Sequence, residues 1–358
     1  MFARKLLLAA ASALLSLLAA EAIVRATDLD RRVLGDPLRD GPFLLRMLVP
    51  DPVLLWRGRP HYRSPGLPAP LNERGFRGPA PGPHKAANVA RIAVLGDSCT
   101  FGVVMRDGAI PAFPRPYPEL LQELLDRAPG GERFEVINYA LIGYTSWHGL
   151  RLLRTQVLTD APDVVVIRFG WNDHFGSTLG RSLSSFRDPV LERLEEWAYR
   201  SRLVALLTYR GIPQARVDRD AWTASPKPTV WVTAEDYAFN LSRTVELAHA
   251  HGARVILLDA PAAPLTPEIL ANRDVLGASG YDSFGRLLEE HARYQAIAAA
   301  VARERGVPFL RTLPAGPPES NGYFGRYDFA HPDARGHARI ARILLEEILR
   351  LAGRRGPD

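Results

Sequence analysis

The sequence predicts an α/β fold, a three-layer α/β/α sandwich in which helices cover both faces of a central, mostly parallel, five-stranded sheet. Short apolar segments alternate with longer amphipathic segments from residue 92 to residue 351, and this alternation is typical of parallel sheets. The run from Val164 to Phe169 is dominated by β-branched residues, as expected of a strand buried on both faces. Polar residues follow several of these segments, and such folds bind ligands beyond the carboxyl ends of their strands.

The elements follow one another in a regular order along the chain. Short, mostly apolar runs that are typical of buried strands occupy residues 92–95, 135–138, 164–169, 255–258 and 307–310. Apolar residues at helical spacing predict helices over residues 118–127, 145–158, 234–251, 284–304 and 334–351. Because helices separate the strands, all the strands can run in the same direction.

The first expected strand leads directly into Gly96, Asp97 and Ser98. A serine at the end of a buried strand is held at the rim of the sheet, where its hydroxyl can meet a substrate. The same pattern is also an ordinary way to begin a helix, with Asp97 or Ser98 capping the exposed amides. This segment alone leaves both interpretations open.

A second polar segment, from Tyr327 to Ala341, lies near the C-terminus and contains Asp328 and His331. At a spacing of three residues, one turn can place the carboxylate against one imidazole nitrogen and leave the other nitrogen free. A serine nucleophile needs such a pair, since the imidazole takes its proton and the carboxylate stabilises the imidazolium. The alternative is an aspartate that merely caps the helix after it.

Two further segments bring hydrogen-bond donors to the same rim. Asn172 follows the third expected strand, and Gly143 lies in the loop after the second. A glycine can bring its backbone amide close to a ligand. His174 comes directly after the Asn172–Asp173 pair and either touches substrate or supports the loop.

Together these segments resemble the SGNH hydrolase family, also called the GDSL esterases and lipases, over about residues 72–351. The blocks stand in the family's order: G-D-S at Gly96–Ser98, a glycine at Gly143, G-W-N-D at Gly170–Asp173 and D-F-A-H at Asp328–His331. The resemblance implies a flavodoxin-like sheet, and a stretch at Asn72–Gly78 is similar to one seen in some membrane-anchored members.

The resemblance also implies a role for each matching residue. Ser98 would be the nucleophile, His331 the general base and Asp328 its orienting carboxylate. The backbone amides of Ser98 and Gly143 and the side-chain amide of Asn172 would form the oxyanion hole. Asp97 and His174 are further candidates for contact with substrate.

Other chemistry is not expected from this sequence. Cys99 stands where the family name implies leucine, and we expect a buried, inert thiol because a lone cysteine is usually a small buried hydrophobe. The histidines lack metal-ligand spacing, and no Gly-x-Gly-x-x-Gly or Walker loop is present. We therefore expect no metal and no cofactor. The net charge of +6 comes mostly from scattered arginines, so nucleic acid is not an expected partner.

The N-terminal segment predicts export. Arg4 and Lys5 precede an apolar run from Leu6 to Ala20, which continues weakly to residue 24. A basic flank and about 15 apolar residues suit a secretory signal, whereas about 19 would just span a bilayer. We favour an uncleaved anchor with the basic end inside, because Glu21 spoils the pattern of small residues at which a signal would be cleaved.

We expect four regions: an anchor or signal over residues 1–27, a Pro/Gly/Arg-rich spacer over 28–88, and a catalytic domain over 89–352 with an insertion at 175–232. The insertion carries Trp197, Tyr199, Tyr209, Trp222 and Trp231. These aromatic side chains could stack on sugar rings, enter a membrane interface, line an acyl groove or pack the insertion onto the domain. The oligomeric state stays open.

The expected function is an exported bacterial serine esterase, anchored in the membrane or secreted, that cleaves a carboxylic ester through an acyl-serine. An extracytoplasmic location makes O-acyl groups of envelope glycans and acyl chains of lipids the leading substrates. An O-acyltransferase would need the same site, with a sugar hydroxyl as acceptor. A non-catalytic glycan-binding protein on the same fold is the third alternative.

Overall fold

The computed structural model describes residues 2–34, 46–64, 66–82, 84–106, 110–129, 133–177, 180–209, 229–271, 276–277, 279–314 and 322–353. Its contacts divide the chain into two compact units. One unit comprises Met1–Trp56 and Phe186–Val217, and the other comprises Arg57–Ser185 and Asp218–Asp358.

The second unit is built on a five-stranded sheet whose strands all run parallel. The spatial order is β6 (Arg133–Asn138), β3 (Val89–Gly96), β7 (Val164–Arg168), β8 (Arg254–Leu258) and β9 (Phe309–Leu310). In chain order this is 2-1-3-4-5, the flavodoxin-like arrangement. The chain therefore reverses its direction of travel between β3 and β7, and ligands of such sheets bind at this switch point.

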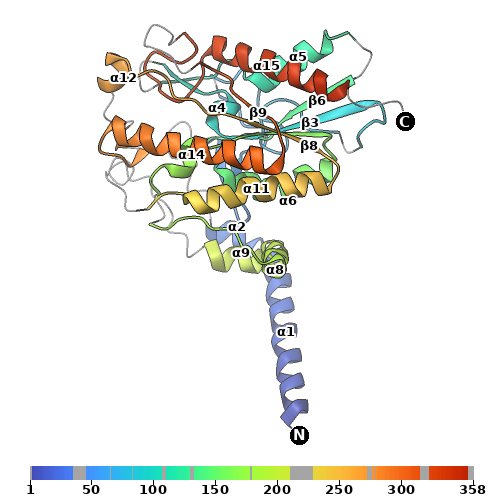
Figure 1. Ribbon diagram of the computed structural model, residues 1–358. Coiled ribbons are helices and arrows are strands. Elements are labelled where there is room, and N and C mark those ends of the chain that lie inside the picture. The colour runs from blue at the N-terminus through green and yellow to red at the C-terminus, as the bar shows by residue number, and fades with distance from the viewer. Residues whose placement is uncertain are drawn as a thin grey trace. The chain divides into compact units, whose positions relative to one another are not determined.

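Helices cover both faces of the sheet (Figure 1). On one face lie α5 (Tyr117–Asp126) and α15 (Ala334–Ala352), and on the other lie α6 (Ser146–Thr155), α11 (Ala234–Ala250) and α14 (Phe284–Arg305). Helix α15 buries Ile340, Leu344 and Ile348, which recur at helical spacing along one face. The predicted three-layer α/β fold is confirmed, and each expected strand and helix overlaps an observed one.

Shorter elements connect these layers. In the second unit they are α4 (Ser98–Phe101), β4 (Val104–Arg106), β5 (Ile110–Ala112), a 3-10 turn η1 (Val157–Asp160), α7 (Trp171–His174) and α12 (Pro267–Ala271). The first unit contains α1 (Phe2–Thr27), α2 (Leu29–Leu34), β1 (Leu48–Asp51), α8 (Pro189–Tyr199) and α9 (Arg202–Tyr209). Strand β2 (Leu55–Gly58) begins in the first unit and ends in the second.

One helix of the described residues, Arg4–Thr27 within α1, is long and apolar enough to cross a membrane. Only 6% of its most apolar 18-residue window is buried. Because it lies at the N-terminus, it could be a signal anchor or a signal sequence.

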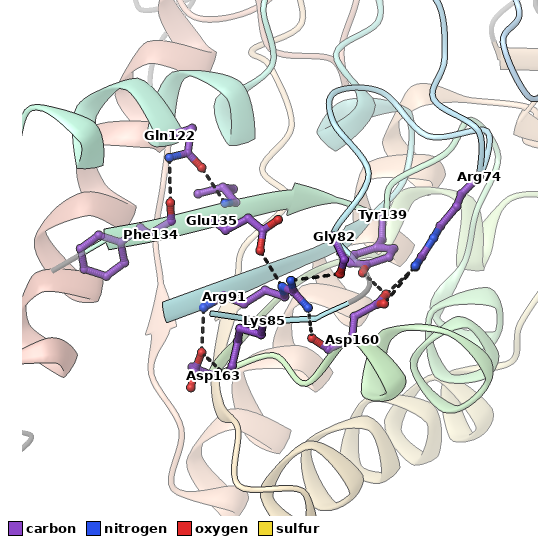
Figure 2. A network of polar contacts seen from close by, with 11 residues as sticks. Arg74, Gly82, Lys85, Arg91, Gln122, Phe134, Glu135, Tyr139, Asp160 and Asp163 are labelled. Atoms are coloured by element: carbon purple, nitrogen blue, oxygen red, sulfur yellow. Dashed lines mark hydrogen bonds and ion pairs between the residues drawn. The ribbon is translucent and has the colours of Figure 1, made fainter. Parts of the chain in front are cut away.

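Ion pairs and hydrogen bonds hold the stretch that precedes β3 against the amino ends of the strands (Figure 2). Arg91 Nε donates to the Glu135 carboxylate at 2.7 Å, and Arg91 Nη1 donates to the Asp160 carbonyl. Arg74 forms two hydrogen bonds with the Asp160 carboxylate, at 2.6 and 3.1 Å, and Lys85 Nζ lies 2.8 Å from Asp163. This part of the predicted spacer is therefore packed onto the second unit by ion pairs.

The predicted insertion contributes to both units. Trp231 N donates to Phe175 O at 2.9 Å, and Leu183 N donates to Trp231 O at 2.7 Å. These bonds join the end of the insertion to the second unit. Helices α8 and α9 belong to the first unit. The side chains of Tyr199 and Tyr209, and all of Trp222, lie outside the described residues.

Candidate active site

The structure of the turn after β3 shows which residue caps the helix that follows. Asp97 is the residue that caps α4, since its Oδ1 accepts the Cys99 amide at 2.9 Å. A side chain at Gly96 would come within 2.2 Å of Thr100 Oγ1, so only glycine fits there. Because Asp97 provides the cap, the hydroxyl of Ser98 is available for another partner.

That partner is His331, 233 positions further along the chain. Ser98 Oγ lies 2.8 Å from His331 Nε2, and His331 Nδ1 lies 2.8 Å from Asp328 Oδ2. Asp328 Oδ1 also accepts the amides of Ala330 and His331, both at 3.0 Å. The carboxylate is 4% exposed and the imidazole 20%, so Asp328 is shielded from water while His331 remains accessible.

The carboxylate and the imidazole shift each other's pKa. Burial alone would raise the pKa of Asp328, but the charge of His331 and the hydrogen bonds outweigh it and lower the pKa below its usual range. Burial alone would lower the pKa of His331, but Asp328 outweighs it and raises that pKa. At neutral pH the carboxylate is therefore ionised, and the imidazole is a stronger base than an ordinary histidine.

Cys99 joins these two segments through one hydrogen bond, and its thiol is not reactive. Its thiol donates to the Ala330 carbonyl at 3.3 Å, next to His331. Burial raises the pKa of Cys99 well above its usual range, so the reactive thiolate is not formed at neutral pH. The prediction of a buried cysteine is confirmed.

The loop that carries Gly143 is bonded to the end of β3. Tyr139 N donates to Val94 O at 2.9 Å, and Leu141 N donates to Gly96 O at 3.3 Å. Gly143 has φ of 79°, a left-handed conformation that glycine adopts without strain. The structure thus brings this loop beside the turn that carries Ser98.

Asn172 lies in α7, which directly follows β7. Its Nδ2 donates to Tyr144 O at 3.0 Å, so the amide is held against the Gly143 loop. A primary amide has two hydrogens, and the side chain is half-buried, so a second hydrogen bond to a ligand is feasible. Ser98, Gly143 and Asn172 all follow strands at the switch point of the sheet.

The structure places Asp97 and His174 away from solvent, at 1% and 0% exposure. The two His174 nitrogens contact Tyr281 Oη and His291 Nδ1, each at 3.0 Å. Burial lowers the pKa of His174, and it lowers the pKa of His291 to about 3. These neutral, buried rings hold the end of α7 against the rest of the second unit. Contact of His174 or Asp97 with substrate stays a prediction, and their burial does not favour it.

The sequence did not reveal two residues that position segments of the site, Asp173 and Arg77. Asp173 accepts the Ser146 amide at 2.8 Å and so joins α7 to the start of α6. Arg77 donates to the carbonyls of Phe101 and Gly102, both at 3.2 Å, at the end of α4. The Asn72–Gly78 motif was the available signal for Arg77, but a motif does not reveal which carbonyls a side chain reaches.

Among the described residues, no group of three or more His, Cys, Asp or Glu side chains is arranged to hold a metal ion.

This chain is similar in sequence and fold to known hydrolases. The model of the GDSL-like lipase/acylhydrolase family matches residues 94–339. No curated protein matches. One similar solved structure is Axe2, an acetylxylan esterase from Geobacillus stearothermophilus, with a TM-score of 0.44, 17% identity and coverage of 72% of this chain and 94% of that one. Another is a GDSL-like lipase from Bacteroides thetaiotaomicron, with a TM-score of 0.40, 16% identity and coverage of 73% and 88%.

The family assignment rests on the length of the family match and on the fold. The matched residues run from the centre of β3 to α15 and include Ser98, Gly143, Asn172, Asp328 and His331. The chain therefore belongs to the GDSL-like lipase/acylhydrolase family, the SGNH hydrolases, and is a serine hydrolase acting on ester bonds.

Proposed function

We propose that this enzyme is a membrane-anchored, extracytoplasmic esterase that removes O-acyl groups from an envelope glycan or lipid through an acyl-serine. The observation that carries the chemistry is the unbroken contact chain from Ser98 through His331 to Asp328 at the carboxyl end of β3. The location is supported by the apolar helix α1 and its basic residues Arg4 and Lys5.

In the first step, His331 Nε2 takes the proton of Ser98 as Oγ attacks the ester carbonyl carbon. Asp328 holds the proton on Nδ1 and stabilises the imidazolium that forms. When the tetrahedral intermediate collapses, the carbon–oxygen bond to the alcohol breaks and His331 protonates the leaving oxygen. Water then attacks the acyl-serine with His331 again as base, which releases the carboxylic acid and restores Ser98.

The carbonyl oxygen becomes negative in both steps, and three donors are proposed to face it. They are the amides of Ser98 and Gly143 and the Asn172 side chain. Ser98 is the first residue of α4, and amides in the first turn of a helix have no partner within the helix. Fixed donors of this kind stabilise the developing charge more strongly than the neutral carbonyl.

Asn172→Ala is expected to lower kcat by about 100- to 1,000-fold with little change in KM. The amide would bind the oxygen mainly as it becomes charged, so its loss affects the transition state. Steady-state kinetics with a soluble ester, together with a thermal melt, measures both quantities. A change confined to KM would instead make Asn172 a ground-state binding residue.

Hydrolysis of short p-nitrophenyl esters by the full-length chain, with and without a sugar acceptor, tests the reaction class. We expect release of acid in both cases and a transient acyl group on the Ser98 peptide, detected by mass spectrometry. Acylated sugar as the main product would favour the transferase, because the acceptor hydroxyl would then replace water. No turnover and no acyl-serine would favour the glycan-binding protein.

We propose the domain limits on the same basis: an anchor over residues 1–27, a spacer over 28–88 and a catalytic domain over 89–352 with an insertion at 175–232. Acyl esters and the membrane are the proposed partners.

A further inference from the structure

Helix α8 of the first unit exposes its apolar side chains. Val190 is 65% exposed, Leu194 56% and Trp197 70%, and Leu191 is also exposed, whereas Glu192 is 6% exposed. A helix at the surface of a water-soluble protein has the opposite arrangement, with its charged residues outward and its apolar residues buried. We call Val190, Leu191, Leu194 and Trp197 the α8 apolar face.

The four residues form one continuous face. At about 100° of rotation per residue, their side chains lie within roughly 120° of one another around the helix axis. Glu192 points to the opposite side, and Glu195 lies at one edge of the stripe, about 40° beyond Leu191. The α8 apolar face is therefore a coherent stripe and not a set of scattered hydrophobic residues.

The neighbouring helix α9 is bonded to the end of α1. The Glu21 carboxylate accepts the amides of Arg202 and Leu203 at 2.9 and 2.8 Å, and Ser201 Oγ at 2.7 Å. The amides in the first turn of a helix have no acceptor within the helix, and a negative charge there is stabilised by the helix dipole, so Glu21 caps α9. Glu21 is thus the residue that joins α9 to α1.

Two arginines extend this junction. Arg25 Nη2 donates to the Arg200 carbonyl at 2.8 Å, and Arg202 Nη1 lies 2.7 Å from Asp28. A helix pair bonded to residues 21–28 in this way keeps a fixed position along α1. In Figure 1 the label for α8 stands with those for α9 and α2 at the C-terminal end of α1, within the same unit.

The depth of this junction in a bilayer follows from helix geometry. The 15 residues from Leu6 to Ala20 rise by about 22 Å, and the stretch from Leu6 to Thr27 rises by about 33 Å. A hydrocarbon core is about 30 Å thick. If Arg4 and Lys5 hold Leu6 at the inner boundary, the outer boundary falls near Ala26, within the stretch of residues 21–28 to which α9 is attached.

We infer that the α8 apolar face is a second membrane contact, which lies in the outer interface of the bilayer that α1 spans. This inference rests on the proposed anchoring by α1. The occupant of the face is lipid, because the junction holds α9, which directly follows α8, at the end of the apolar helix α1. Trp197 is of the residue type that favours this interface, and exposed Arg193 and Arg200 flank the face, where they can meet lipid phosphates.

The same contacts assign α1 to the mature protein. A cleaved signal would remove Glu21 and leave the partly buried amides of Arg202 and Leu203 without this acceptor, which costs stability. The chain would then also lose the bond between Arg25 and Arg200. We therefore expect the purified membrane form to retain the residues before Ala22.

The test uses the full-length chain in vesicles of phosphatidylethanolamine and phosphatidylglycerol. Leu194→Cys and Trp197→Cys are labelled with a polarity-sensitive fluorophore and exposed either to nitroxide-bearing lipid or to aqueous iodide. The unsubstituted chain is the labelling blank, since its single thiol is buried. Glu289→Cys in α14, which is exposed, is the matched control, and Glu195→Cys, at the edge of the α8 apolar face, tests how far the lipid contact extends.

We expect nitroxide lipid to quench positions 194 and 197 several-fold more than position 289, and iodide to quench them several-fold less. Position 195 should be quenched less by the lipid than its two neighbours on the α8 apolar face. Iodide quenching of 194 and 197 that equals that of 289 would place the face in water and overturn the inference. Self-quenching that rises with protein density, without lipid quenching, would show a second copy on the face and would also overturn it.

Glu21→Leu tests the junction itself. Leucine preserves the apolar character of α1 but removes the acceptor for α9, so lipid quenching at 194 and 197 should fall towards the value at 289. Glu21→Gln retains an acceptor oxygen and should keep most of the quenching. Full quenching in Glu21→Leu would show that Glu21 does not position the helices.

Two measurements on the same samples separate this inference from the proposed function. Intact mass reports the N-terminus, and a mature chain beginning near Ala22 would overturn both the retained anchor and the junction. Turnover of a soluble ester reports the catalytic site independently. Iodide-accessible labels with normal turnover would overturn the membrane contact alone, whereas lipid-quenched labels without turnover would overturn the esterase alone.

Discussion

Ser98→Ala is expected to reduce ester turnover by about 10⁶-fold, the scale of losing the nucleophile of a serine hydrolase, and to leave the thermal midpoint almost unchanged. The hydroxyl is the only atom group removed, and without it no acyl-serine can form. The small stability effect follows from the structure, because Asp97 and not Ser98 caps α4. Progress curves with a p-nitrophenyl ester and a thermal melt measure the two effects.

Ser184→Ala, at an exposed serine of the same unit, is the matched control and should retain full turnover. A Ser98→Ala enzyme that kept most of its activity would refute the assignment of the nucleophile. Activity that survived together with a stability loss above about 1 kcal/mol would indicate instead that Ser98 is a cap.

Asp328→Asn is expected to lower kcat by about 10⁴-fold and to change the pH profile. As the proposed general base, His331 must be neutral, and Asp328 raises its pKa. Activity should therefore fall as the pH drops through a value above the ordinary histidine pKa of about 6.5. Without the negative charge the pKa of His331 falls, so the acidic limb of the variant should move to lower pH.

The size of the loss has a geometric cause. The amide nitrogen of the substituted side chain can face His331 Nδ1 only as a donor, so the imidazole keeps its hydrogen on Nε2. That hydrogen then points at Ser98 and the ring can no longer take its proton. The profile of kcat/KM against pH is the measurement.

Asp333→Asn is the matched control for this substitution. Asp333 caps α15 by accepting the amides of Arg335 and Gly336, both at 2.9 Å, so its change should affect stability and not the pH profile. An unshifted acidic limb in Asp328→Asn would mean that the carboxylate does not set the pKa of His331. The assignment of Asp328 as the carboxylate that orients His331 would then be refuted as well.

Much of the fold was predictable because its signals are local. Each strand of the central sheet is a short apolar run, and each covering helix repeats its buried residues at helical spacing, as Ile340, Leu344 and Ile348 do in α15. Alternation of the two patterns is enough to favour a parallel sheet. The residue types of the proposed site were predictable for the same reason, since G-D-S and D-F-A-H are contiguous in the chain.

The division of the chain into units was not predictable in this way. The insertion was identified by its position between repeating elements, but the sequence does not show that α8 and α9 join the N-terminal helix. That association depends on one long-range junction, in which Glu21 meets the amides of Arg202 and Leu203. The outward orientation of Trp197 likewise depends on which side of α8 the rest of the unit covers.

By itself the sequence determined the order of the elements and the chemical groups available at the ends of the strands. Only the tertiary structure decided which groups meet. It assigned the cap to Asp97 and paired Ser98 with a histidine 233 positions away, and it buried His174 against His291. The physical reason is that hydrophobic periodicity is a property of neighbouring residues, whereas hydrogen-bond partners and burial depend on how distant segments pack.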